Sequence, residues 1–301
     1  MAQTDIQAGQ ASRLILAGMA VLGLTDNLLA FITATSSLWQ FHLIRGSLVV
    51  LAALVLSVLL GSPIRPKRLV AVLARSAFIA GAMIIYFGCL ALLPIGVVVA
   101  GLFTSPLFVL ILTDVFQRRR VGPVRWGAVC LGFVGALLVI RPDPAALDPI
   151  AFLPIVAGLL YAIGAVATRA WCEGESTLTL TAFFFGLLAL SGALGVALLP
   201  AGAEGAEGFP VRGWMPLSPD ILLWTGAQAI GALIGIGFIF RAYLVGEASY
   251  VAVFEYSLLI FASAWGWVLW GQAVPVTGIV GMVFIAGAGI IIARRSEQAS
   301  A

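Results

Sequence analysis

Long apolar runs separated by short polar stretches recur along almost the whole chain. After a polar start at residues 1–12, each run is about 17–24 residues long, and roughly 20 helical residues cross the ~30 Å hydrocarbon layer of a bilayer. The runs cover residues 14–33, 41–60, 69–92, 96–116, 124–140, 150–171, 178–199, 221–243, 248–270 and 275–293. Because backbone polar groups find no water in hydrocarbon, each run is expected to be a helix. The pattern predicts an all-α membrane protein with ten transmembrane helices.

The composition supports a membrane protein and argues against an enzyme. The chain has 301 residues, of which 62% are hydrophobic and only 10% charged, against roughly 25% charged in soluble domains. One His and one Lys leave little material for metal or general-base chemistry, and neither an HExxH nor a GxSxG motif is present. We therefore expect no cofactor, no metal and no nucleic-acid partner. A disulfide framework is not expected either, since two of the three cysteines (Cys89, Cys130, Cys172) lie at membrane depth.

Basic residues concentrate in the loops on one side of the predicted bundle. The side that holds both termini carries 13 of them: Arg13, Arg65, Lys67, Arg68, Arg75, Arg118, Arg119, Arg120, Arg125, Arg169, Arg241, Arg294 and Arg295. The opposite side carries Arg141 and Arg212, and Arg45 lies inside the second helix. Because cytoplasmic loops are rich in Lys and Arg, both termini are expected in the cytoplasm, in a multi-pass protein of the bacterial inner membrane.

The two halves of the chain show weak internal repetition. The fourth and ninth runs align with Phe103 on Phe254 and Thr104 on Glu255, and the fifth and tenth runs align with Gly127 and Gly135 on Gly281 and Gly289. Five helices per half is an odd number, so the second half must enter the membrane upside down. Inverted repeats are typical of transporters with a midplane site. We predict repeats at residues 13–143 and 144–295, with cytoplasmic tails at 1–12 and 296–301.

Short motifs in both halves resemble one transporter family. They are Ala91-Leu92-Leu93-Pro94-Ile95 and Ser105-Pro106 around the fourth helix, and Gly127-x7-Gly135 and Gly281-x7-Gly289 at the ends of the halves. From about Arg13 to Arg295 the chain resembles the EamA-type drug/metabolite transporter superfamily, and within it the bacterial aromatic amino acid exporters. The resemblance implies ten helices as two inverted five-helix repeats, a central cavity and export of small metabolites.

One carboxylate stands out inside the ninth run. Glu255 lies between Phe254 and Tyr256 in an otherwise apolar segment, and intramembrane carboxylates usually face a polar pathway. It is expected to bind a substrate amine or a coupling proton; the alternative is a structural carboxyl satisfied by neighbours such as Arg241. We predict that one central cavity is lined by Thr104, Ser105, Tyr161, Gln228, Glu255 and Tyr256.

A second pair of charges lies in the first two helices. Asp26 and Arg45 fall at similar depths, which favours an interhelical ion pair with a structural or gating role. The alternative is that Arg45 binds a substrate carboxylate. In the fourth helix, Pro106 is expected to leave a carbonyl unpaired and to bend the helix.

The predicted cavity favours a small neutral substrate. An amino acid offers an amine for Glu255 and a carboxylate for Thr104, Ser105 and Gln228, whereas a highly anionic substrate would require more mid-depth cations than Arg45 alone. We therefore predict a secondary transporter that exports aromatic or other neutral amino acids by alternating access. The alternatives are a transporter of another metabolite or drug, such as a nucleobase or sugar derivative, and a channel. A monomer in the lipid bilayer is expected, with a homodimer as the alternative.

Overall fold

The computed structural model is helical, without strands, throughout the part of the chain that it describes, which comprises residues 2–29, 31–32, 36–90, 92–116, 121–143, 149–201 and 208–298. The elements are α1 (Ala2–Asp26), α3 (Leu38–Leu59), α4 (Leu69–Cys89), α5 (Ile95–Leu102), α6 (Ser105–Phe116), α7 (Pro123–Ile140), η2 (Pro149–Phe152), α8 (Leu153–Trp171), α9 (Thr177–Leu198), α10 (Pro219–Val245), α11 (Ala248–Glu255), α12 (Ser257–Trp270) and α13 (Val276–Gln298). Ten stretches within them are long and apolar enough to cross a membrane. The predicted all-α fold with ten candidate spans is therefore confirmed.

The outer surface of the bundle carries apolar side chains where a soluble protein would carry charges. Leu51, Val58, Ile230 and Val283, from three different helices, are each more than half exposed. Soluble proteins rarely expose apolar patches on this scale. In a bilayer the same side chains contact lipid tails, so the surface fits a membrane-spanning bundle.

The fourth span is interrupted halfway across the bundle. α5 ends at Leu102 and α6 begins at Ser105, just before Pro106, whose nitrogen carries no hydrogen. At the break, the hydroxyl of Thr104 donates a hydrogen bond to the carbonyl oxygen of Gly101 over 2.6 Å. The bend expected from Pro106 is thus a break in the helix, and a side chain satisfies one of the backbone acceptors there.

The ninth span is interrupted in a similar way without a proline. α11 ends at Glu255 and α12 begins at Ser257, whose hydroxyl donates to the carbonyl oxygen of Phe254 over 2.6 Å. As in the fourth span, a hydroxyl satisfies the carbonyl three residues earlier. The sequence contained no signal for this second break, because serine is common within membrane helices.

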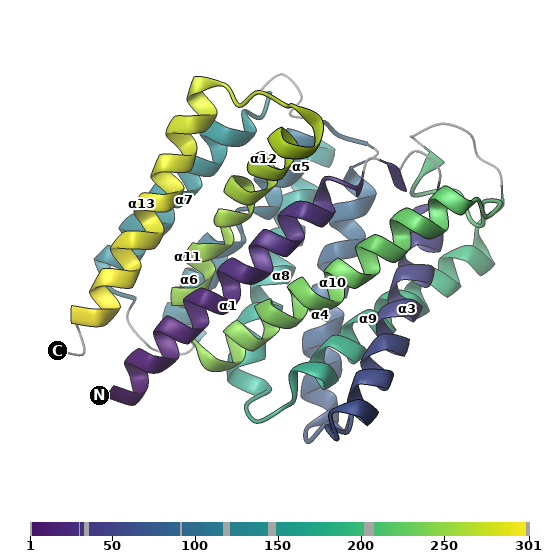
Figure 1. Ribbon diagram of the computed structural model, residues 1–301, viewed down its shortest axis with the longest axis horizontal. Helices are drawn as coiled ribbons and strands as arrows, with labels where there is room; N and C mark the ends of the chain where they lie inside the picture. Colours follow the sequence, from purple (N-terminus) through teal and green to yellow (C-terminus); the bar gives the residue numbers. More distant parts are fainter. Residues whose placement is uncertain are drawn as a thin grey trace.

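The spans pack in a reciprocal pattern between the two halves (Figure 1). The first span (α1) lies along the eighth (α10), and the third (α4) lies along the sixth (α8). The second span (α3) packs on the seventh (α9), and the fifth (α7) on the tenth (α13). Two inverted repeats would produce this exchange, since the first helix of each half then meets the third helix of the other. The pattern supports the predicted repeats, whose boundaries remain predictions.

The crossing of α7 and α13 brings two backbones into contact. A Cβ atom on Gly135 would lie 2.6 Å from the carbonyl oxygen of Gly281, and one on Gly281 would lie 2.5 Å from that of Gly135. Only glycine fits at both positions. In this contact Gly135 faces Gly281. The sequence alignment instead paired Gly127 with Gly281, and Gly127 lies about two helical turns from Gly135.

Both termini lie at the same end of the bundle, which we call the terminal end (Figure 1). The loop between α3 and α4, with Arg65, Lys67 and Arg68, also lies there. One residue assigned to this charged side is placed differently, because Arg75 is fully buried within α4. Outside the described residues lie Ala91 of the quoted motif, Arg118, Arg119 and Arg120. The charge asymmetry supports cytoplasmic termini, and the orientation remains a prediction.

Thiol labelling of intact cells tests this orientation. In a variant with Cys130→Ala, a cysteine replacing Leu217, exposed before α10, should react with a membrane-impermeant thiol reagent. A cysteine replacing Glu173, exposed between α8 and α9 at the terminal end, should react only after the cells are permeabilised. The other two cysteines are buried and give little background. The reverse labelling pattern would place both termini outside the cell.

Candidate functional site

A cavity of about 380 Å³ lies inside the bundle between the two interrupted spans. Its volume falls within the range of roughly 300–1,000 Å³ that is typical of small-molecule sites. Helices from both halves of the chain line it. Its polar lining residues are Asp26, Asn27, Arg45, Tyr86, Ser105, Tyr161, Gln228, Glu255, Ser263 and Gln272.

The cavity extends from the middle of the bundle toward the end opposite the termini. Asp26 is the last residue of α1, Phe87 lies near the end of α4, and Ile95 begins α5. These three helix ends all lie away from the terminal end (Figure 1). The deepest contacts come from mid-helix residues such as Met19 and Ile239.

The terminal end of the bundle is closed by polar contacts between helix ends. Arg125 at the start of α7 forms a two-pronged ion pair with Glu247, with Nη–Oε distances of 2.5 and 2.7 Å. Ser249 at the start of α11 accepts a further bond from Arg125 over 2.8 Å. Within the described residues this is the one ion pair shorter than 4 Å. It joins α7 to the segment that leads into the interrupted ninth span.

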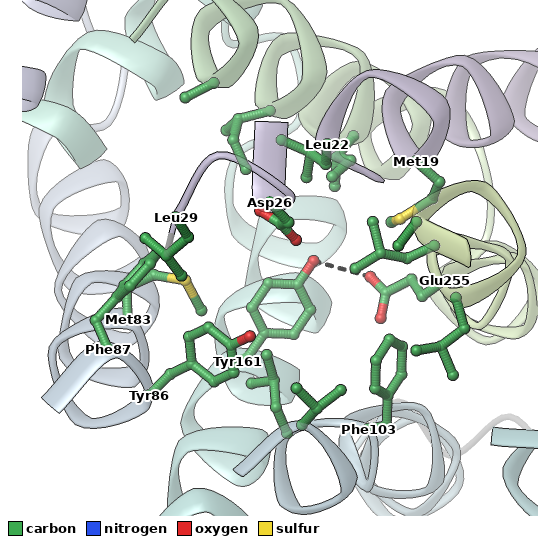
Figure 2. A pocket seen from close by; sticks show the side chains of 18 of the residues that line it. Met19, Leu22, Asp26, Leu29, Met83, Tyr86, Phe87, Phe103, Tyr161 and Glu255 are labelled. Atoms are coloured by element: carbon green, nitrogen blue, oxygen red, sulfur yellow. Dashed lines mark hydrogen bonds between the residues drawn. The ribbon is translucent and has the colours of Figure 1, made fainter. Parts of the chain in front are cut away.

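Aromatic rings form much of the cavity wall. The lining includes Tyr86, Phe87, Phe103, Tyr161, Phe184 and Phe185. Figure 2 shows Tyr161 projecting into the middle of the cavity, with Tyr86 and Phe103 on either side of it. A largely apolar wall with a few placed polar groups is the usual character of a small-molecule site.

Glu255 is buried at the break in the ninth span and is 4% exposed. Its Oε1 accepts hydrogen bonds from the hydroxyls of Tyr161, at 2.9 Å, and Tyr243, at 2.7 Å. The carboxylate borders the cavity (Figure 2), and its Oε2 accepts no hydrogen bond from the described residues. No described basic side chain lies within 4 Å of it, and Arg241 is exposed on the bundle surface. Glu255 is thus oriented by hydroxyl groups and not by a cation.

Arg45 is enclosed by aromatic rings on the opposite wall. Its guanidinium carbon lies 4.4 Å from the ring centre of Phe41 and 5.0 Å from that of Phe87. Its Nη1 donates to Oε1 of Gln228 over 3.2 Å, and its Nε has no partner among the described residues. Rings over a guanidinium stabilise the charge in a desolvated site. The cation is held at the cavity wall together with the amide of Gln228.

The predicted ion pair between Asp26 and Arg45 is not a direct contact. Both residues line the cavity, yet their charged atoms are not within 4 Å of each other, because Arg45 is directed toward Gln228 and the surrounding rings. The field of Arg45 still acts on the Asp26 carboxylate without a direct contact. Their gating role remains a prediction.

Four of the six residues predicted to line the cavity do so, namely Ser105, Tyr161, Gln228 and Glu255. The other two lie beside it. Thr104 is bonded to its own helix, and its hydroxyl fills the space next to Gly158, where a Cβ would lie 2.7 Å away. Tyr256 is fully buried in the notch left by Gly132 and stacks on Phe103 with ring centres 5.8 Å apart.

Two further residues lie near the site although the sequence did not predict their positions there. Tyr243 bonds Glu255 from α10, and nothing local in the sequence sets it apart from other buried tyrosines. Arg75 lies 3.6 Å above the ring of Phe240 and donates to Thr168 Oγ1 over 2.7 Å. The sequence pattern assigned Arg75 to the charged side of the bundle. Its position several residues inside the apolar run 69–92 indicates burial instead.

Comparisons with known proteins identify relatives among membrane transporters. No family model matches the chain. It is 29% identical over 239 residues to a riboflavin transporter of Rhizobium johnstonii, covering 77% of this chain and 70% of the relative. It is 27% identical over 228 residues to a riboflavin transporter of Brucella anthropi (75% and 77% covered). It is 24% identical over 216 residues to the pseudopaline exporter CntI of Pseudomonas aeruginosa (71% and 72% covered).

A solved crystal structure has the same fold. It matches 99% of both chains with a TM-score of 0.75 at 15% sequence identity, which shows the shared fold alone. Together with the ten candidate spans, the named relatives show a multi-pass membrane transporter of small molecules and not an enzyme. The EamA-type assignment and the amino acid substrate remain predictions.

Two tyrosine variants separate the groups that hold Glu255 from those that only pack. Tyr243→Phe removes a hydrogen bond to a buried carboxylate and should lower the stability by roughly 1.5–3 kcal/mol. Tyr256→Phe removes a buried hydroxyl that has no partner among the described residues, so the stability should stay unchanged or rise. Thermal unfolding in detergent measures both. Equal loss in the two variants would contradict the geometry described for Glu255.

Proposed function

We propose that the chain is a secondary transporter that carries a flat, uncharged heteroaromatic molecule of the riboflavin type through this cavity by alternating access. The observation that carries the proposal is the cavity wall itself, which combines six aromatic rings with a few polar groups. The riboflavin transporters among the relatives support the same substrate class.

The wall offers suitable contacts for a fused ring system. Tyr86, Phe103 and Tyr161 present ring faces and edges to a planar ligand, and stacking of a heteroaromatic ring on an aromatic side chain is worth about 1–3 kcal/mol. Arg45 and the amide of Gln228 donate hydrogen bonds to ring carbonyl groups. Glu255 lies at the cavity wall, where its carboxyl group can form a hydrogen bond with a polar group of the ring system.

The charges of the cavity disfavour an anionic substrate. Arg45 is the one cation among its lining residues, and two carboxyl groups, those of Asp26 and Glu255, border the same cavity. A phosphorylated substrate would therefore enter a site without spare positive charge, and like charges oppose binding.

Aromatic amino acids form the second candidate class, and one observation favours them. Arg45 and Glu255 carry opposite charges and border the same cavity, as an amino acid with a free carboxylate and a free amine would require. The resemblance to amino acid exporters favours the same class and an outward direction. The phenylalanine, tyrosine or tryptophan ring would occupy the aromatic wall.

The arrangement of the two interrupted spans supports alternating access. Discontinuous helices that meet at a midplane site are a recurring feature of secondary transporters. Here Phe103 and Ser105 of the fourth span and Glu255 of the ninth border the cavity. The ion pair of Arg125 and Glu247 closes the terminal end, while the cavity lies toward the other end. During transport the terminal end would open and the opposite end of the cavity would close.

Counterflow in proteoliposomes tests the function and ranks the substrates. Vesicles loaded with unlabelled riboflavin should take up labelled riboflavin in a saturable manner. Unlabelled riboflavin in the medium should compete, and its phosphorylated form should not. Competition by tryptophan and phenylalanine but not by riboflavin would favour the second candidate class. An ion current without counterflow would show a channel and contradict both.

A substitution at Gln228 tests the polar edge of the cavity. Gln228→Leu removes an amide that bonds Arg45 and borders the cavity, so the apparent KM for riboflavin should rise about tenfold, as expected for one lost hydrogen bond. Thr225→Val, about one turn earlier on α10 and outside the cavity lining, is the matched control and should leave the KM unchanged. Equal KM values in both variants would remove Gln228 from the proposed site.

A further inference from the structure

Glu255 is a carboxyl group of the cavity that has no cation beside it. The charged lining residues are Asp26, Arg45 and Glu255. The field of Arg45 acts on Asp26, although the two groups form no ion pair within 4 Å. Around Glu255 the described partners are two tyrosine hydroxyls, both bonded to the same oxygen. A charge on this carboxylate is therefore held by neutral groups alone.

The groups that face Glu255 from the helices packed around it are nearly all uncharged. Tyr161 faces it from α8, Tyr243 from α10, and Tyr256 follows it in the chain. Asp26 of α1 lies on the other side of the Tyr161 hydroxyl (Figure 2). Among the described side chains, the remaining ionisable groups of the helices packed on α11 lie near the helix ends or on the outer surface: Arg13, Asp114, Arg125, Cys130, Arg169, Asp220, Arg241 and Arg294.

Arg75 is the nearest buried cation that does not border the cavity. Its field reaches Tyr161, but it stands over the ring of Phe240 and is bonded to Thr168. It makes no ion pair within 4 Å with any described carboxylate. Arg75 therefore acts on Tyr161 and does not pair with Glu255.

Filling the cavity with an uncharged molecule changes the surroundings of Glu255. Oε2, which accepts no hydrogen bond from the described residues, depends on water in the cavity for solvation. A flat substrate that displaces this water leaves an ionised carboxylate in apolar surroundings, which is strongly unfavourable. Adding a proton removes the charge. Proton binding and substrate binding therefore strengthen each other, and such coupling is reciprocal.

We propose that Glu255 is a proton-binding site and that the protein carries one proton together with each uncharged substrate molecule. This inference rests on the proposed riboflavin-type substrate. A hydronium ion in the cavity water gives its proton to Oε2. One O–H bond of the hydronium breaks, one O–H bond forms on Oε2, and a neutral water molecule is left. The resulting carboxylic acid donates to a carbonyl group of the substrate while the tyrosine hydroxyls keep Oε1 in place.

The direction of coupling follows from the charge of the substrate. An uncharged substrate requires the proton, so both move together and an inward proton gradient drives uptake. A substrate with an ammonium group would replace the proton at Glu255, and the two would move in opposite directions. The sign of the coupling thus reports which chemical class occupies the site.

The experiment uses the full chain in proteoliposomes with the membrane potential clamped at zero. At equal pH, counterflow of labelled riboflavin establishes transport. With the outside made one pH unit more acidic, riboflavin should accumulate inside up to about tenfold, the limit for one proton per substrate. A sodium gradient at equal pH should produce no accumulation. Loss of counterflow itself would overturn the proposed function, which distinguishes that failure from failure of the coupling.

Variants and a binding measurement complete the test. Glu255→Gln should lose the accumulation driven by the pH gradient, whereas Glu173→Gln, an exposed carboxylate between α8 and α9, should keep it. Adding riboflavin to the purified protein in weakly buffered detergent should raise the pH of the medium, and Glu255→Gln should abolish this rise. Counterflow without any response to the pH gradient would overturn the proposal. So would efflux driven by external acid, or accumulation driven by sodium alone.

Discussion

The hydrocarbon layer contains no water, and each polar group that enters it must find a partner within the protein. Regular helices provide that partner for most of the backbone. Where the fourth and ninth spans break, Thr104 and Ser257 supply hydroxyl groups to the carbonyls. Charged side chains follow the same constraint, since Arg125 pairs with Glu247 at the terminal end and Arg75 lies on an aromatic ring. Three further charged side chains within the spans, Asp26, Arg45 and Glu255, border the cavity, so the site lies where the bundle can hold water or a ligand.

The fold could be predicted from the sequence because the bilayer imposes one length on every span. Ten apolar runs of similar length leave little choice of architecture, and ten candidate spans are found. The break at Pro106 also followed from local chemistry. The break before Ser257 did not, because only its contact with the Phe254 carbonyl distinguishes this serine from others.

The site was predicted less completely, for a physical reason. In a helix that is apolar all round, the pattern of residues does not show which face points inward, so depth can be estimated but direction cannot. The estimated depth was sufficient to place Ser105, Tyr161 and Gln228 at the cavity. It placed Tyr256 in the cavity wall, although Gly132 leaves a notch that receives its ring on the other side. Tyr243 was missed because its role depends on a contact between helices.

The cavity combines the opposite charges of Asp26 and Arg45 with one carboxylate held by neutral hydroxyls. This arrangement leaves its net charge open to change by a single proton or by a substrate, while the aromatic rings keep their places. Selectivity and energy coupling would then arise from the same few side chains, with Tyr161 bordering the substrate space and also bonding Glu255. The relatives named as riboflavin transporters and as a pseudopaline exporter show how widely substrates differ among proteins of similar sequence.

The two hydroxyl-satisfied breaks have a mechanical consequence. α5 and α11 are short helices of only eight residues each, and where each joins the rest of its span a side-chain hydroxyl donates a hydrogen bond to a backbone carbonyl. The angle at such a break can change while the backbone carbonyl keeps a hydrogen bond to the side-chain hydroxyl within the membrane. Tilting α5 or α11 then requires little free energy for exposing unpaired backbone groups. The long helices around them can stay in place. Replacing either hydroxyl with a methyl group would stiffen or fray the joint, so these two small side chains influence the speed of the transport cycle without contacting its cargo.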